Sequence, residues 1–228
     1  MSTIVPLDTL VELATMSTPS IANGIERFKL RPNDTGYMDG TIACRFPKLG
    51  PLVGHAVTAR IRAAGNADQL PGRADLWRHA LDIHEPRVVV IEDLDSPPGI
   101  GSFWGEVNAN VFRALGCRGV ITNGGVRDLP EMEALGFHAF SSVLSVSHAY
   151  VRVVEVGVPV RVGGLIVHPG DLLHGDRHGV VLVPLEIASQ VPDAVRAVEA
   201  QERKFIEFLQ SPTFTAEKLI ETATPGED

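Results

Sequence analysis

The sequence is short of basic residues. Its 20 lysines and arginines are outnumbered by 28 aspartates and glutamates, which leaves a formal net charge of -8 at pH 7. Proteins that bind nucleic acid gain much of their affinity from positive side chains that displace counterions from the phosphates. The charge balance therefore argues against nucleic acid as a direct partner.

Cysteines and long apolar runs are also scarce. Only Cys44 and Cys117 are present, and each lies in an apolar stretch where a small buried thiol is the common outcome. No window approaches the roughly 18 apolar residues of a membrane span, and residues 1–20 lack the basic start and apolar core of a signal peptide. We expect a reduced, cytoplasmic protein without membrane contact.

Tracts of disordered composition are missing as well. With 44% hydrophobic and 21% charged residues, the 228-residue chain has the material for one well-buried core. We predict a single α/β domain over residues 1–210 and a C-terminal extension over residues 211–228.

Apolar periodicity alternates between helices and strands through the middle of the chain, which predicts an α/β arrangement. Valines with glycine turns at residues 150–167 indicate antiparallel strands. The other predicted elements are a helix near residues 7–14, a helix with Thr18 as its N-cap, a half-buried strand at 53–61, a helix at 74–83, a buried strand from Arg87, a helix at 103–115, a strand from Gly119, a helix at 129–135 and a long amphipathic helix that ends near Leu209.

The segment Asn123-Gly124-Gly125-Val126-Arg127-Asp128 is the first candidate site, because it follows a buried strand and precedes a helix. Open α/β sheets bind ligands at such strand ends. The glycines allow a tight turn, Arg127 offers a forked donor for a carboxylate, and Asp128 offers an oxygen ligand for a divalent cation. The alternative is structural, since Asp128 and Glu131 also form a D-x-x-E capping box.

A second candidate is the glycine-rich loop that leads into the next helix, residues 99–108. Free amides at a helix start can hold an anionic group. The loop only approximates a dinucleotide fingerprint, because residues 95–98 separate it from its strand. Glu106 is either part of this site or simply an acid favoured by the helix dipole.

Three histidines, His168, His174 and His178, crowd one turn near the end of the sheet region. Their spacing matches no zinc motif, so turn and surface histidines are the favoured interpretation. Asp171 and Asp176 are expected to shape turns.

Three segments together carry a family resemblance: STPSIANGI at residues 17–25, WGEVNANVFRALGCRGVITNGGVRDLPEME at 104–133 and VHPGDLLHGDRHGVVLVP at 167–184. In this order and spacing they resemble the RraA-like proteins, which include the 4-hydroxy-4-methyl-2-oxoglutarate and 4-carboxy-4-hydroxy-2-oxoadipate aldolases. The resemblance implies an α/β single domain of the swivelling β/β/α, phosphohistidine-domain-like type, with mixed sheets and flanking helices. It also implies a homotrimer or homohexamer with active sites at subunit boundaries.

In the aldolase branch, the resemblance implies that pyruvate is held by backbone amides of Gly105, Glu106, Val107 and Asn108 and by Arg127. The aspartate that matches Asp128 ligates Mg²⁺ or Mn²⁺. The family also has an aspartate twenty-one residues before the arginine, where this sequence has Glu106, and an acidic residue from a neighbouring subunit that is not matched here.

These matches predict a class II aldolase that cleaves a 4-hydroxy-2-oxo acid through a metal-stabilised pyruvate enolate, with oxaloacetate decarboxylation as a side activity. Glu106 and Arg127 would be the catalytic residues, and none of the four lysines, Lys29, Lys48, Lys204 and Lys218, lies in these loops. The alternative is a non-catalytic, protein-binding regulator of ribonuclease activity. A second substrate carboxylate would be met by a basic residue on the far side of the pocket, with these candidates: His55, Arg60, Arg62, Arg73 and Arg78.

Overall fold

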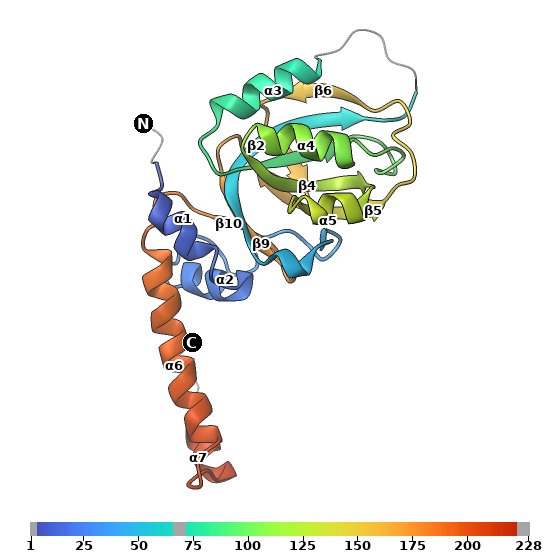
Figure 1. Ribbon diagram of the computed structural model, residues 1–228. Coiled ribbons are helices and arrows are strands. Elements are labelled where there is room, and N and C mark those ends of the chain that lie inside the picture. The colour runs from blue at the N-terminus through green and yellow to red at the C-terminus, as the bar shows by residue number, and fades with distance from the viewer. Residues whose placement is uncertain (1–3, 66–71, 223–228) are drawn as a thin grey trace.

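The computed structural model describes residues 4–65 and 72–222 (Figure 1). Its helices are α1 (Leu7–Leu13), α2 (Thr18–Glu26), α3 (Arg73–Asp82), α4 (Glu106–Ala114), α5 (Leu129–Ala134), α6 (Val191–Leu209) and α7 (Ala216–Thr222), with a short 3₁₀ helix at Pro47–Leu49. Its strands are β1 (Ala43–Cys44), β2 (Leu52–Arg62), β3 (Arg87–Asp93), β4 (Cys117–Val126), β5 (His138–Leu144), β6 (Arg152–Val156), β7 (Val160–Val162), β8 (Leu165–Val167), β9 (Leu172–Asp176) and β10 (Gly179–Val183).

One mixed sheet forms the centre of the molecule. Its strand order is β1-β5-β4-β3-β2-β9-β10, with β6 also paired to β2. The pairs β2–β3, β3–β4 and β4–β5 are parallel, whereas β9, β10, β6 and β1 pair antiparallel. Strands β7 and β8 form a separate hairpin. This confirms the predicted α/β class with mixed sheets and flanking helices.

Strand β2 is buried along nearly its whole length, so the prediction of a half-buried strand was wrong. Its residues 52–55 pair with β9 and residues 59–62 pair with β6, while β3 lies along the other edge. Both faces are also covered: Val57 and Ala59 contact one apolar core, and Ala56 contacts another. A central strand covered on both faces carries apolar residues on each.

Helices α3, α4 and α5 cover one face of the parallel strands (Figure 1). The core between them contains a cluster of rings, in which Trp104 lies 5.1 Å from Phe112 and 5.7 Å from Phe137, centroid to centroid. The opposite face is covered by the β7–β8 hairpin and residues 38–42. The carboxyl ends of β3 and β4 therefore lie beside a layer of packed aromatic rings.

Helices α1, α2 and the first half of α6 form a separate apolar layer against β9 and β10. Helix α2 begins at Thr18, and its N-cap is Ser17, whose side chain accepts a hydrogen bond from the Ser20 amide at 3.1 Å. The predicted cap, Thr18, was thus one residue late. Its hydroxyl lies 3.0 Å from Nδ1 of the buried His174 instead, which joins α2 to the sheet.

In the described part of the chain, no helix is both long enough and apolar enough to cross a membrane.

Candidate active site

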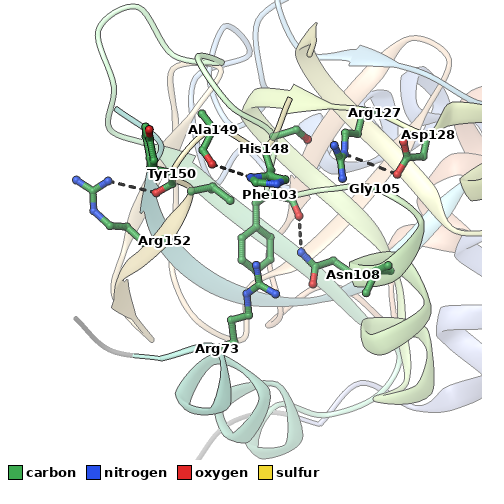
Figure 2. Close-up of a pocket in the computed structure, with 13 residues that line it drawn as sticks. Arg73, Phe103, Gly105, Asn108, Arg127, Asp128, His148, Ala149, Tyr150 and Arg152 are labelled. Carbon is green, nitrogen blue, oxygen red and sulfur yellow. Dashed lines mark hydrogen bonds and ion pairs between the residues drawn. The ribbon is translucent and has the colours of Figure 1, made fainter. Parts of the chain in front are cut away.

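A pocket of about 530 Å³ lies where β4 and the loop before α4 meet the segment that leads into β6. Its lining includes Gly105, Val107, Asn108, Arg127 and Asp128, five of the six predicted site residues. Figure 2 shows Arg127 and Asp128 on one side of the pocket and Tyr150 on the other. The two candidate segments of the sequence therefore form one site.

Asp128 does not cap helix α5, although it is the N-cap residue. Its backbone is left-handed, with φ 54° and ψ 46°, and its side chain makes no capping hydrogen bond. Instead, Oδ2 accepts a hydrogen bond from the Glu106 amide at 3.0 Å, and Oδ1 has no hydrogen-bond partner within the described residues. The capping-box alternative was therefore wrong, and the carboxylate lines the pocket.

Gly105 is the residue that lets this carboxylate approach helix α4. A Cβ at Gly105 would lie 2.4 Å from Asp128 Oδ2 and 3.2 Å from Arg127 Cγ. Helix α4 begins after it, at Glu106, whereas the sequence predicted a start near Phe103. The reason is that Trp104 forms a parallel bridge with Val126, which continues the sheet.

The first turn of α4 presents free amides to the pocket. Among the described residues, the amides of Val107 and Asn108 have no hydrogen-bond acceptor, as expected for the first turn of a helix. The Asn108 side chain donates to the Phe103 carbonyl, so it fixes the loop. An anionic group placed here would meet N–H donors and the positive end of the helix dipole.

Arg127 lies beside Asp128, with 3.7 Å between its Nε and Asp128 Oδ2. Both side chains are 37% exposed. The backbone of Arg127 is fixed, because its amide donates to the Trp104 carbonyl at 3.1 Å. The guanidinium thus keeps donors available for an anion next to a carboxylate that can hold a cation.

The prediction that Gly124 and Gly125 form a tight turn was wrong. Both lie inside strand β4 without positive φ. A Cβ at Gly125 would lie 2.0 Å from Ser145 Oγ, and one at Gly124 would lie 3.0 Å from Asp93 Oδ2. Close packing of side chains therefore explains these glycines.

Two buried carboxylates at the end of β3 shape the loop before α4, and the sequence analysis missed them. The Asp93 carboxylate accepts hydrogen bonds from the backbone amides of Asp95, at 3.0 Å, and Gly99, at 2.7 Å. The Asp95 carboxylate accepts hydrogen bonds from the amides of Ala63 and Ala64. Burial raises the pKa of the Asp93 carboxyl above its ordinary value. The available signal was a pair of acids at residues 93 and 95, one at the end of a buried strand and one just after it.

Comparison with known proteins bears directly on this site. The family model described as RraA-like, Aldolase/RraA, matches residues 14–182. The chain belongs to the RraA-like family. This match contains all the residues of the candidate site named so far.

Relatives of known sequence match a shorter stretch. An uncharacterized protein of Methanocaldococcus jannaschii is 31% identical over 105 residues, 46% of this chain and 50% of the relative. A protein of Halalkalibacterium halodurans, provisionally named a 4-hydroxy-4-methyl-2-oxoglutarate aldolase, is 26% identical over 121 residues, 51% of this chain and 58% of the relative. The chain thus spans little more than half the length of these relatives.

Solved structures share the fold over more of the chain. An uncharacterized protein of Pseudomonas syringae pv. tomato has a TM-score of 0.74 at 24% identity and covers 97% of both chains. Streptomyces coelicolor RraAS2, titled an unusual member of the RNase ES inhibitor RraA protein family, has a TM-score of 0.68 at 21% identity, over 87% of this chain and 96% of that one. Such likenesses confirm an RraA-like fold.

The donor set of this RraA-like site fits a mostly hydrated divalent cation. Within residues 4–65 and 72–222, no group of three or more histidine, cysteine, aspartate or glutamate side chains could hold a metal ion. Among the residues that the structure describes, Asp128 is the one that offers a free carboxylate oxygen to the pocket. Mg²⁺ is commonly held by one or two carboxylates, with waters and substrate oxygens as the other ligands, so a single carboxylate suits it.

Glu106 differs from the other predicted site residues in the position of its side chain. Its backbone amide positions Asp128, but its side chain is exposed and is not among the residues that line the pocket.

Of the basic residues considered for a second carboxylate, Arg73 lines the pocket. Arg60 pairs with Glu92 and Glu155, and Arg78 pairs with Asp75. His55 is buried, with Nδ1 3.2 Å from the Gly170 carbonyl, and Arg62 does not line the pocket.

The three histidines near the end of the sheet region lie in different environments. His168 and His178 are exposed, as predicted, but His174 is fully buried, with Nε2 3.0 Å from the Leu13 carbonyl. The surface prediction was wrong for His174 because α1 and α2 cover β9. Asp171 and Asp176 accept backbone amides in turns, as expected.

Proposed function

We propose that this protein is a divalent-metal-dependent lyase, a class II aldolase that cleaves a 4-hydroxy-2-oxo acid to pyruvate and a second oxo compound. The observation that supports it is the meeting of Arg127, Asp128 and the free amides of α4 in one pocket. Oxaloacetate decarboxylation is the expected side activity, because it also releases pyruvate through the enolate.

The 2-oxo acid end of the substrate would bind against α4. The amides of Val107 and Asn108 would donate to its carboxylate, and the dipole of α4 favours negative charge at that position. Arg127, which lies beside the start of α4, would donate to the same end of the molecule. Because the Asn108 side chain and the Arg127 amide are tied to the loop of Phe103 and Trp104, these donors are held in place before substrate arrives.

Asp128 would hold Mg²⁺ or Mn²⁺ beside this carboxylate. Such a cation, when bound, supplies the positive charge that stabilises an enolate oxygen. The Glu106 amide donates a hydrogen bond to Asp128 Oδ2, which leaves Oδ1 available to the cation. Arg127 would add a fixed positive charge close to the developing enolate.

Glu106 would transfer the proton between the 4-hydroxyl and the product through a bound water. Glu106→Gln is expected to lower kcat about 100-fold, the usual scale for a lost acid or base, while the affinity for Mg²⁺ stays within about twofold. Steady-state kinetics and a metal titration test this. An unchanged kcat would remove Glu106 from the mechanism.

The test of the function is pyruvate release from 4-hydroxy-4-methyl-2-oxoglutarate and from oxaloacetate, measured with lactate dehydrogenase, with Mg²⁺ or Mn²⁺ and with a chelator. We expect release with the metal and none with the chelator. Asp128→Asn is expected to abolish it, since asparagine tolerates the left-handed backbone but loses the charge. Asp34→Asn, the same change at an exposed loop position, is the control.

The second candidate function is a protein-binding regulator without catalysis. It is favoured by two solved structures of similar fold: RraAS2, titled an unusual member of an inhibitor family, and the RNA-processing inhibitor RraA of Thermus thermophilis, at a TM-score of 0.51 and 20% identity. Absence of pyruvate release, together with absence of Mg²⁺ binding, would favour this candidate over the lyase.

We also propose a cytoplasmic location and a homotrimeric or homohexameric assembly. Both cysteines are free, which suits a reducing compartment.

A further inference from the structure

The pocket contains a histidine that has no role yet in the proposed reaction. His148 lies between β5 and β6, and it lines the pocket together with Arg127 and Asp128. Figure 2 shows its ring between Ala149 and Arg127. Histidine is the side chain that most readily takes up and releases a proton near neutral pH. A group suited to proton transfer therefore faces the candidate site.

The hydrogen bond of His148 determines which ring nitrogen can accept a proton. Its Nδ1 lies 2.6 Å from the Ala149 carbonyl oxygen. Because a carbonyl oxygen can only accept, Nδ1 carries a hydrogen, and in the neutral ring Nε2 then has the free lone pair. Nε2 has no hydrogen-bond partner among the residues that the structure describes. The basic nitrogen of the ring is therefore available to a substrate.

The backbone around His148 is held against the loop before α4. The Ser147 carbonyl accepts a hydrogen bond from the Ser102 amide at 2.9 Å, and Ser147 Oγ accepts one from the Ala149 amide at 3.0 Å. A Cβ at Gly101 would lie 2.6 Å from the His148 carbonyl oxygen. Ala149 has a positive φ of 45°, and strain of this kind often marks a functional segment. The ring is thus carried by a fixed backbone.

The other polar side chains known to line the pocket are not suited to take a proton from a hydroxyl group. Arginines only donate hydrogen bonds, and amides and neutral hydroxyls are very weak bases. The carboxylate of Asp128 is the proposed ligand of the cation. The remaining side chains concerned are Arg73, Ser102, Asn108, Arg127, Tyr150 and Arg152.

We propose that His148 is a catalytic base, which takes the proton of the substrate's 4-hydroxyl at Nε2. As the O–H bond breaks, its electron pair forms the carbonyl at C4. The C3–C4 bond breaks, and its electron pair stays on the pyruvate unit as the enolate. His148 then passes the proton through the bound water to Glu106, which delivers it to C3. This inference rests on the proposed function, in which Glu106 completes the transfer to the product.

The test compares two reactions in one variant, both measured as pyruvate release in Mg²⁺. Cleavage of 4-hydroxy-4-methyl-2-oxoglutarate needs the removal of a hydroxyl proton, whereas oxaloacetate has no such hydroxyl and loses CO₂ instead. His148→Gln should lower kcat/KM for the hydroxy acid about 100-fold, the usual scale of a lost general base. Release from oxaloacetate should stay within twofold, because that reaction has no step for this base.

Two further variants serve as comparisons. His84→Gln, the same change at an exposed position outside the pocket, should leave both reactions unchanged. Glu106→Gln should slow both, because each reaction ends with the protonation of C3.

Full activity of His148→Gln on the hydroxy acid would overturn the role of His148 and leave the lyase intact. An equal loss of both reactions would overturn it as well, since this would mean that the variant disturbs the shared binding site. If the unaltered protein releases no pyruvate from the hydroxy acid, the lyase itself is contradicted, and the role of His148 with it.

Discussion

The left-handed backbone of Asp128 is the residue-scale feature on which the candidate site depends. Such a conformation costs a residue with a Cβ about 1 kcal/mol, and aspartate tolerates it better than most. A helix cap does not offset this conformational cost, because the carboxylate accepts a hydrogen bond from the Glu106 amide in α4 instead of from an amide of α5. A strained residue whose side chain serves a pocket is typical of a functional position.

Gly105 gives the sharpest residue-scale prediction. Its φ of -168° suits any residue, so Gly105→Ala should fold normally, but the new Cβ would displace the Asp128 carboxylate. We expect pyruvate release to fall about 100-fold, since displacement of a ligand-binding group by an ångström has effects of that order. Gly40→Ala, where a Cβ meets nothing within 4 Å, is the control. Equal activity of both variants would contradict the assigned geometry.

At this scale, the sequence predicted residues that the structure brings together around one pocket, but it did not predict their contacts. The motif at residues 123–128 allowed a metal ligand or a helix cap at Asp128, and local spacing could not choose between them. The structure excludes the cap, because the Asp128 carboxylate accepts a hydrogen bond from the Glu106 amide, 22 residues away in the chain. Arg73 shows the same limit, because only the packing of α3 against Phe103 separates it from Arg78.

At the scale of elements, the order of helices and strands was predictable, whereas burial was not. Alternation in β2 indicated one buried face, but pairing with β3, β6 and β9 and cover from both sides buried both faces. His174 was expected at the surface because its neighbours form turns. Helices α1 and α2, more than 150 residues earlier, cover it.

A buried histidine at the start of β5, His138, leads us to expect that the stability of the protein depends on pH. Burial lowers the pKa of His138 from 6.5 to about 4, so between these values the unfolded chain holds a proton that the folded chain lacks. The free energy of unfolding should therefore fall as the pH drops from 6.5 to 4, by at most about 1.4 kcal/mol per pH unit from this residue. Above pH 6.5 the effect vanishes.

The measurement is urea unfolding at pH 7 and pH 5. His138→Gln should lose less stability than the unaltered protein between these two values, because glutamine does not titrate. His84→Gln, at an exposed position, should match the unaltered protein. Identical losses in all three proteins would assign the acid sensitivity to other groups, of which the buried His174 is the next to test, since burial lowers its pKa as well.

At the scale of the whole molecule, packing within a single chain does not explain the length of helix α6 or its exposed apolar side chains. Its start packs against α2 through the buried Val191 and Val195. Its second half extends away from the sheet, with α7 at its far end (Figure 1). There Phe205, Ile206 and Leu209 are 46%, 38% and 37% exposed. Apolar side chains gathered on one surface commonly mark a contact between proteins.

We therefore predict that this half of α6 contributes to a homotrimer or homohexamer. Phe205→Glu combined with Leu209→Glu should lower the mass measured by light scattering after size exclusion, because charges replace apolar contacts, while Glu202→Gln on the same helix should leave it unchanged. Pyruvate release should fall together with the mass if a neighbouring subunit completes the site. A monomer before any substitution would contradict the assembly, and an unchanged mass in the double variant would place the interface elsewhere on the chain.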